Sequence, residues 1–502
     1  MDAPIVTTTA GRVRGARLDG GIARFPSVPY AAPPDGPLRF APPAPAVGWE
    51  GVREAGGAPG PNAPQPPRGA GFGIDMTPVI GTGWRPGAEY LTADVWTPDP
   101  GAGGLPVMVF VHGGAFVAGE ASAPAYDGSA LARAGVVLIA VNYRLGTEGF
   151  LPLPGGATNV GLRDQIAALR WVRDNAAAFG GDPDRVTVFG ESAGAISVGT
   201  LLGSPAASGL FRRAIMQSGG AEMVRGSTDR FAELRERIAA ELGVPATAEA
   251  FRGMPVADVV AAQGRVDVPG GRPDLREPDG IDPGYGIGVF APVRDGDVLP
   301  EPPLDALRSG ASAGVDVLAG TNTDEINLYF VPTGMREAVT ADQVRAMIGA
   351  VHPAPDGLLL AAGAGTPGEQ LCRLLTEQVF AGPTRRTLQA HTEGGARGTG
   401  VGTGRAFGYR FAWRSGACDG RLGACHACDL PFVFGTLPGS TGPDHIPGEK
   451  PPPELSDRMV RAWVSFASTG DPGWVPRDPS DPQVMRFDVT DSVVREPGPF
   501  QG

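Results

Sequence analysis

The chain has 502 residues, of which 42% are hydrophobic and 19% are charged, and this composition is typical of a globular protein that buries a large core. Its formal net charge of −12 repels phosphate backbones and anionic lipid head groups. Since no basic cluster opposes that charge, we expect no nucleic-acid partner.

The N-terminal segment MDAPIVTTTAGRVRG lacks the pattern of a secretory signal, because no positive region precedes an apolar run and no small-residue cleavage site follows. No window of the sequence approaches the roughly 18 apolar residues of a membrane-spanning helix. We therefore expect a cytoplasmic protein without a membrane span.

Two segments rich in glycine or proline are predicted to be irregular. Residues 57–73 form a long proline-rich loop, and residues 394–405 form a flexible connector. Neither segment is expected to be an interdomain linker, because core-like strands lie on both sides of each.

Continuous apolar runs flanked by turns predict strands that are buried on both faces. These runs are residues 107–111, 136–141, 186–189 and 315–319. Between the second and the third run, apolar residues recur at steps of three and four from Leu162 to Val172, which predicts a helix that ends at Gly180. Strands that alternate with helices predict a parallel sheet covered on both faces.

The pattern G-x-S-x-G, typical of serine hydrolase nucleophiles, occurs around Ser192 and again around Ser312. Ser192 follows the strand at 185–189 and precedes AGAISVGTLL, a helix-compatible run, and this strand-to-helix turn is where a parallel sheet presents a nucleophile. Ser312 instead follows the helical pattern PPLDALRSG and precedes the strand VDVLAG, so its glycines serve as a helix cap and a turn. We predict that Ser192 is the nucleophile.

A nucleophilic serine needs a base, and in this type of fold the base is a histidine that follows a sheet strand further along the chain. His426 follows the strand candidate at 406–413 and is the favoured base. His391 ends the polar helical pattern TRRTLQAHTEGG and is predicted to lie on the surface. The remaining histidines are His352 and His445, which lie in proline-containing loops, and His112, which precedes the serine.

The acid should follow the strand VDVLAG, where spacing leaves Asp324 and Glu325 as alternatives. The oxyanion donors are predicted in VMVFVHGGAF, a strand that runs into a glycine-rich turn. Such a turn supplies backbone N–H groups opposite the nucleophile, and the N–H of Ala193 supplies another.

Three of the four cysteines, Cys418, Cys425 and Cys428, lie near His426 and raise the possibility of a zinc site. Zinc ligands of this type come as two separated pairs, and the second pair is missing. We therefore expect reduced thiols and no metal.

Long motifs in the expected order resemble those of the type-B carboxylesterases, the esterase and lipase family that contains bacterial para-nitrobenzyl esterases and the cholinesterases. The motifs include HGGAF, FGGDPDRVTVFGESAGA, GTNTDE and HACDLPFVFG, and the resemblance covers essentially the whole chain. Residue by residue, it implies a catalytic triad of Ser192, Glu325 and His426. It also implies an oxyanion hole formed by the N–H groups of Gly114, Ala115 and Ala193. Two further residues, Ser218 and Asp429, are implied to help hold the acid and the histidine.

The resemblance also implies one large α/β-hydrolase domain over residues 1–502. Its central sheet is expected to be mixed but mainly parallel, with helices on both faces, a small N-terminal antiparallel sheet, and helical insertions at about 220–300 and 326–400. The family's N-terminal disulfide is expected to be absent, because Ala63 and Tyr90 stand at its cysteine positions. The family also has a structural ion pair to the arginine that corresponds to Arg39. In this sequence Glu89 is the only nearby candidate for its partner.

The implied activity is hydrolysis of a small-molecule carboxylic ester, of short to medium chain or with an aryl or benzyl group, through an acyl-enzyme on Ser192 and without a cofactor. Adhesion proteins that share the fold are the alternative from another class, but they have lost the serine that is present here. Lipase, amidase, carbamate hydrolase and polyester hydrolase activities share the same triad chemistry. Tyr329, Phe330 and Met335 follow the acid, and the sequence assigns them no substrate role.

Overall fold

The computed structural model describes residues 3–67, 73–224, 226–267, 272–397 and 404–500. Within these ranges an eleven-stranded sheet has the strand order β14-β13-β12-β11-β10-β9-β7-β8-β6-β4-β3. Its strands are β3 (Ala16–Arg17), β4 (Ala23–Pro29), β6 (Thr92–Thr97), β7 (Leu105–Val111), β8 (Val137–Val141), β9 (Gly181–Glu191), β10 (Arg213–Gln217), β11 (Asp316–Asn322), β12 (Ala406–Phe411), β13 (Gln483–Phe487) and β14 (Ser492–Arg495).

The seven strands from β8 to β13 in this order run parallel, and antiparallel strands complete both edges. This confirms the predicted mixed, mainly parallel sheet. A small N-terminal sheet consists of β1 (Ile5–Thr8), β2 (Gly11–Arg14) and β5 (Val52–Glu54). Strands β1 and β2 are antiparallel as expected, whereas β5 runs parallel to β2.

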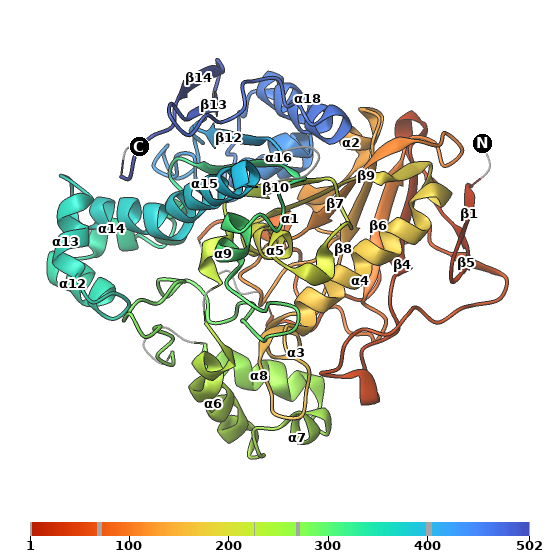
Figure 1. Cartoon of the computed structure of the whole chain (residues 1–502), viewed down its shortest axis with the longest axis horizontal. Coiled ribbons are helices and arrows are strands. Elements are labelled where there is room, and N and C mark those ends of the chain that lie inside the picture. Colours follow the sequence, from red (N-terminus) through yellow and green to blue (C-terminus); the bar gives the residue numbers. More distant parts are fainter. Residues whose placement is uncertain (1–2, 68–72, 225, 268–271, 398–403, 501–502) are drawn as a thin grey trace.

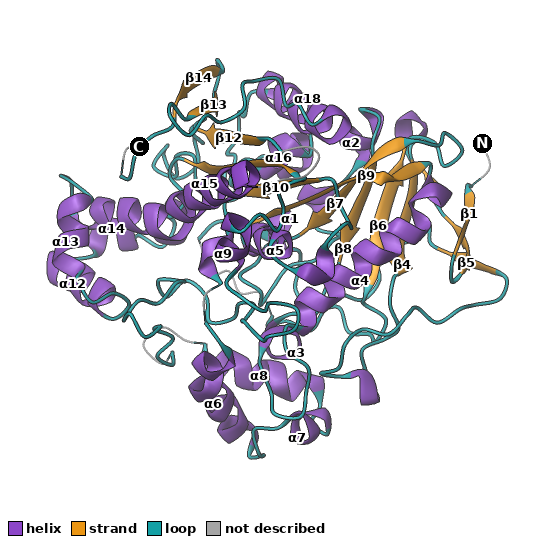
Figure 2. Cartoon of the chain, viewed as in Figure 1, coloured by secondary structure: helices purple, strands orange, loops and turns teal. Residues whose placement is uncertain are grey.

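Helices cover both faces of the large sheet (Figures 1 and 2). The helices are α1 (Thr77–Ile80), α2 (Ser129–Arg133), α3 (Gly146–Phe150), α4 (Val160–Asn175), α5 (Ala193–Leu202), α6 (Ala232–Leu242), α7 (Ala248–Arg252), α8 (Val256–Val266), α9 (Pro303–Arg308), α10 (Asn327–Phe330), α11 (Met335–Ala338), α12 (Ala341–Gly349), α13 (Pro355–Ala361), α14 (Pro367–Leu375), α15 (Gly382–Arg397), α16 (Leu430–Val433), α17 (Leu437–Ser440) and α18 (Pro453–Thr469). A π-helical stretch, Thr376–Ala381, joins α14 to α15.

Strand β7 shows why the sheet strands are continuously apolar. Val107 and Val109 belong to the hydrophobic cluster that contains Leu162 of α4. Met108 and Phe110, which point the other way, belong to a second cluster with Met459 of α18. Since successive side chains of a strand point to opposite faces, both faces are buried and both select apolar residues.

The two segments expected to contain insertions hold helices away from the sheet. Helices α6, α7 and α8 gather at one end of the molecule, and α12, α13 and α14 project at one side (Figure 1). The described part of the proline-rich segment, 57–67 and residue 73, contains neither helix nor strand. Helix α15 extends to residue 397 and so replaces the start of the predicted connector, while residues 398–403 lie outside the described residues.

The prediction that His391 lies on the surface is wrong. Its side chain belongs to α15 and is buried, with Nδ1 3.0 Å from Oγ of Ser312. The helix is polar in sequence, yet this turn of it faces the loop that contains Ser312. Burial lowers the pKa of His391 to about 4.

Arg39 forms a buried ion pair, but its partner is Glu148 and not the candidate Glu89. Nε and Nη2 of Arg39 donate to the two carboxylate oxygens of Glu148, at 2.9 and 2.5 Å, and both side chains are buried. Glu89 is half-exposed and pairs with Arg53 instead. A buried guanidinium needs a buried counter-charge, which Glu148 provides.

Ala63 and Tyr90 are both buried, and the four cysteines are free thiols. In the part of the chain that the structure describes, no helix is both long and apolar enough to cross a membrane.

Candidate active site

Ser192 lies at an abrupt turn between β9, which ends at Glu191, and α5, which begins at Ala193. Its backbone has φ 55° and ψ −122°, a strained conformation for a residue with a side chain. The flanking glycines are required by close approach, because a β-carbon on Gly194 would lie 2.0 Å from the carbonyl oxygen of Val111. The motif therefore fixes the serine at the carboxyl end of the sheet.

His426 lies between Ser192 and Glu325. Its Nε2 is 2.9 Å from Oγ of Ser192, and its Nδ1 is 2.7 Å from Oε2 of Glu325. The three side chains follow β9, β11 and β12 along the chain; β11 and β12 are neighbours in the sheet, and β10 lies between β11 and β9. The structure thus brings together the three residues predicted for the triad.

Glu325 and Asp324 occupy different surroundings although they are adjacent. Oε1 of Glu325 accepts hydrogen bonds from Oγ of Ser218, at 2.6 Å, and from the backbone N–H of Asn322, at 2.7 Å. Asp324 points the other way, where it pairs with Arg414 at 3.0 Å. Only Glu325 of the two contacts His426.

The two residues expected to support the triad do so at different distances. Ser218 contacts Glu325 directly. Asp429 is one layer further out, where it accepts hydrogen bonds from Gln217 at 2.8 Å and from the side chain of Asn322 at 3.2 Å. Asp429 therefore holds the residue whose N–H contacts the acid.

Gly114 and Ala115 form the turn after β7, with φ of 108° and 53°. A β-carbon on Gly114 would lie 2.1 Å from the carbonyl oxygen of Ala118, so this position requires glycine. Among the described residues, no protein acceptor takes the N–H of Gly114 or of Ala115. Ala193 is the first residue of α5, and first-turn N–H groups have no partner within their helix. These three N–H groups remain free to bind an anion.

Glu191 is the residue that sequence reasoning missed. Its buried Oε1 lies 3.2 Å from Nε2 of His426. Burial raises the pKa of Glu191 to about 8. Burial lowers the pKa of His426, but the carboxylates of Glu191 and Glu325 outweigh that effect and raise it to about 9. A carboxylate directly before the serine of GESAG was the available signal.

Replacing Glu191 with glutamine is expected to lower the pKa of His426. A neutral imidazole is the form that accepts a proton, and the nearby carboxylate favours the charged form, so its removal favours the neutral form. The acidic limb of the profile of kcat/KM against pH then moves to lower pH. Ester hydrolysis followed from pH 5 to 10 measures this, and a limb at the wild-type pH contradicts the assigned influence of Glu191.

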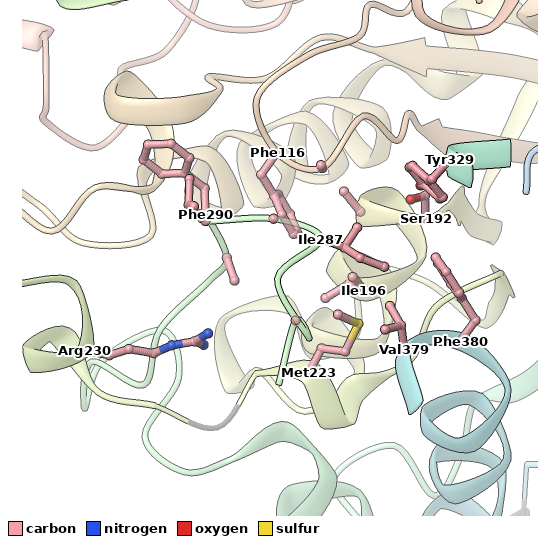
Figure 3. Close-up of a pocket in the computed structure, with 16 residues that line it drawn as sticks. Phe116, Ser192, Ile196, Met223, Arg230, Ile287, Phe290, Tyr329, Val379 and Phe380 are labelled. Atoms are coloured by element: carbon pink, nitrogen blue, oxygen red, sulfur yellow. The ribbon is translucent and has the colours of Figure 1, made fainter. Parts of the chain in front are cut away.

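A pocket with an empty volume of about 630 Å³ opens beside Ser192 (Figure 3). Ser192 lies at one end, and Arg230 lies at the other, where it pairs with Asp282 at 2.9 Å. Most of the lining is apolar or aromatic. It consists of Ala115, Phe116, Ser192, Ala193, Ile196, Met223, Arg230, Gly284, Ile287, Gly288, Val289, Phe290, Ala291, Tyr329, Val379 and Phe380.

Of the three residues that follow the acid, only Tyr329 lines this pocket. Phe330 packs against the cluster that contains Ile326, and Met335 is exposed. Within the described ranges, no group of three or more His, Cys, Asp or Glu side chains is arranged to hold a metal ion. Both ring nitrogens of His426 lie within hydrogen-bond distance of other side chains, Nε2 of Ser192 and Nδ1 of Glu325.

Comparison with known proteins gives consistent matches along the chain. A model of the carboxylesterase family matches residues 2–353 and 361–495. The para-nitrobenzyl esterase of Bacillus subtilis is 34% identical over 94% of this chain and 91% of its own length, and the phenmedipham hydrolase of Pseudarthrobacter oxydans is 34% identical over 93% and 90%. The crystal structure of the Geobacillus stearothermophilus carboxylesterase EST55 superposes with a TM-score of 0.81, at 33% identity and over 98% of both chains.

Proposed function

The chain belongs to the carboxylesterase family and is a carboxylic-ester hydrolase, and from that premise we propose that it hydrolyses esters through an acyl-enzyme on Ser192. The observation that carries this proposal is the position of His426, whose two ring nitrogens lie 2.9 Å from Ser192 and 2.7 Å from Glu325. A base between a hydroxyl and a carboxylate is the arrangement that activates a serine.

In the first half of the proposed reaction, Nε2 of His426 removes the hydroxyl proton as Oγ of Ser192 attacks the ester carbonyl carbon. Glu325 stabilises the imidazolium that forms, and the N–H groups of Gly114, Ala115 and Ala193 donate to the carbonyl oxygen as it becomes negative. The imidazolium then protonates the alkoxide, which leaves as the alcohol.

In the second half, water takes the place of the alcohol. His426 removes a proton from the water as its oxygen attacks the acyl carbon, and the second tetrahedral species collapses to release the acid. Ser192 recovers its proton from His426. The protein groups suffice for every step, so the proposal includes no cofactor.

The pocket supports an ester with apolar groups as the substrate. Phe116, Phe290 and Phe380 line it, and aromatic side chains bury acyl, aryl and benzyl groups well. We propose short- to medium-chain or aryl and benzyl esters on this basis. The names of two similar proteins, phenmedipham hydrolase and para-nitrobenzyl esterase, add phenmedipham and para-nitrobenzyl esters to the compounds worth testing.

We further propose that residues 1–502 form one α/β-hydrolase domain whose segments 220–300 and 326–400 surround the pocket. Most lining residues outside the oxyanion turn and α5 fall in these two segments. The four free cysteines suit a reducing compartment, which supports a cytoplasmic location.

Hydrolysis of p-nitrophenyl acetate tests the proposed reaction class. We expect steady turnover, with a burst of p-nitrophenol equal to the enzyme concentration if deacylation is the slower half. The matched anilide, p-nitroacetanilide, should be cleaved far more slowly, because its amine is a much poorer leaving group. Faster cleavage of the anilide than of the ester would assign the site to amides instead.

A further inference from the structure

A second cavity lies directly beyond one wall of the pocket beside Ser192. Its empty volume is about 690 Å³, and its lining consists of Glu222, Met223, Ile281, Pro283, Tyr285, His352, Gln378, Pro383 and Arg386. Met223 lines both cavities. Figure 3 shows this side chain beside Val379 on the wall away from Phe116.

Neighbouring residues of the same segments line the opposite sides of this wall. In the π-helical stretch, Val379 lines the first cavity and Gln378 lines the second. In the loop before Val289, Gly284 lines the first and Tyr285 lines the second. A single layer of residues therefore separates the two cavities. Since methionine is unbranched and flexible, Met223 is the part of this layer that moves most readily.

The two cavities differ in chemistry. The first is mainly apolar near Ser192, whereas the second is polar. The hydroxyl of Tyr285 donates to Oε1 of Gln378 at 3.1 Å, and Arg386 forms an ion pair with Glu222. Because that pair is internally neutral, the second cavity suits an uncharged group that forms hydrogen bonds, such as a hydroxyl or an amide.

We propose that the second cavity is a subsite for the distal polar end of a long acyl chain, and that Met223 is the specificity-determining side chain that such a substrate displaces. This proposal rests on the proposed esterase function. The acyl part stays bonded to Ser192 after the alcohol has left, so we assign the second cavity to the acyl part rather than to the leaving group. The chain crosses the apolar pocket and places its polar end among Tyr285 and Gln378.

Three substrates distinguish a polar subsite from an apolar pocket that is closed at its far end. They are the p-nitrophenyl esters of acetic, decanoic and ω-hydroxydecanoic acid. A hydroxyl buried in an apolar pocket lowers kcat/KM by about ten-fold, because it loses its hydrogen bonds to water. We expect the opposite, with the ω-hydroxydecanoate hydrolysed at least as efficiently as the decanoate. Gln378→Ala should lower kcat/KM for the ω-hydroxydecanoate relative to that for the decanoate. The matched variant Gln389→Ala, on the exposed side of α15, should leave this ratio at the wild-type value.

Met223→Trp tests the wall itself, since the larger ring closes the passage. We expect it to lower the ratio of kcat/KM for each long ester to kcat/KM for the acetate by about ten-fold, while Met223→Ala raises this ratio. Decyl acetate carries its chain on the alcohol side. An effect of the two Met223 variants on decyl acetate alone would overturn the acyl assignment.

Hydrolysis of p-nitrophenyl acetate also distinguishes a failure of the proposed subsite from a failure of the proposed function. If the wild-type protein does not hydrolyse p-nitrophenyl acetate, the proposed function fails. If the wild-type protein hydrolyses the acetate, but the ω-hydroxyl lowers kcat/KM about ten-fold and Met223→Trp changes kcat/KM equally for all chain lengths, the subsite is wrong and the esterase proposal stands.

Discussion

Replacing Ser192 with alanine is expected to lower kcat/KM for p-nitrophenyl acetate by about 10⁴- to 10⁶-fold, because it removes the hydroxyl that lies 2.9 Å from Nε2 of His426. The oxyanion donors and the pocket remain, so some activity above the uncatalysed rate should persist. Initial rates at ester concentrations well below KM measure the loss, and the thermal midpoint of unfolding checks that the variant is folded.

Ser312→Ala is the matched control, since Ser312 lies in the other G-x-S-x-G pattern and also contacts a histidine, His391. Its loop follows α9 and precedes β11, so it is not presented at a strand-to-helix turn. Activity of the Ser312 variant should stay within about two-fold of the wild type. Equal losses in the two variants would remove Ser192 from its assigned role.

Replacing Glu325 with glutamine is expected to lower kcat by about 10³- to 10⁴-fold. Ser218 and the N–H of Asn322 donate to Oε1 of the acid, so the amide oxygen takes that side and the amide NH₂ faces His426. The ring nitrogen Nδ1 must then accept, which leaves the proton on Nε2. In that tautomer His426 cannot take the proton of Ser192.

The adjacent carboxylate provides the control for this substitution. Asp324→Asn removes a charge one residue away, but Asp324 pairs with Arg414 rather than with His426. We expect kcat within about two-fold of the wild type, and any effect of the lost ion pair should be a lower free energy of unfolding. A larger loss of kcat in the Asp324 variant than in the Glu325 variant would exchange their roles.

The sequence predicts the environment of Ser192 well because the signals there are local. The run AGAISVGTLL coincides with α5 (Ala193–Leu202), and the strand before it and the glycines around it act within a few residues. The choice between Asp324 and Glu325 is not local. It depends on how the loops after β11 and β12 lie side by side, and here the resemblance to a family supplied what spacing did not.

Features decided by tertiary packing escaped the sequence analysis. His391 belongs to a polar helix, yet it is buried against Ser312. Arg39 pairs with Glu148, which is far away in sequence, rather than with the candidate Glu89. The pocket draws its lining from several separated segments, so no single pattern marks it.

The most direct test of the central claim is covalent labelling with a fluorophosphonate, followed by peptide mass spectrometry. The probe reacts with a serine only where a base and oxyanion donors activate it. We predict one label per chain, on Ser192, and its loss in the His426→Ala variant. Labelling of another serine, or no labelling of a folded protein that hydrolyses p-nitrophenyl acetate, would contradict the account.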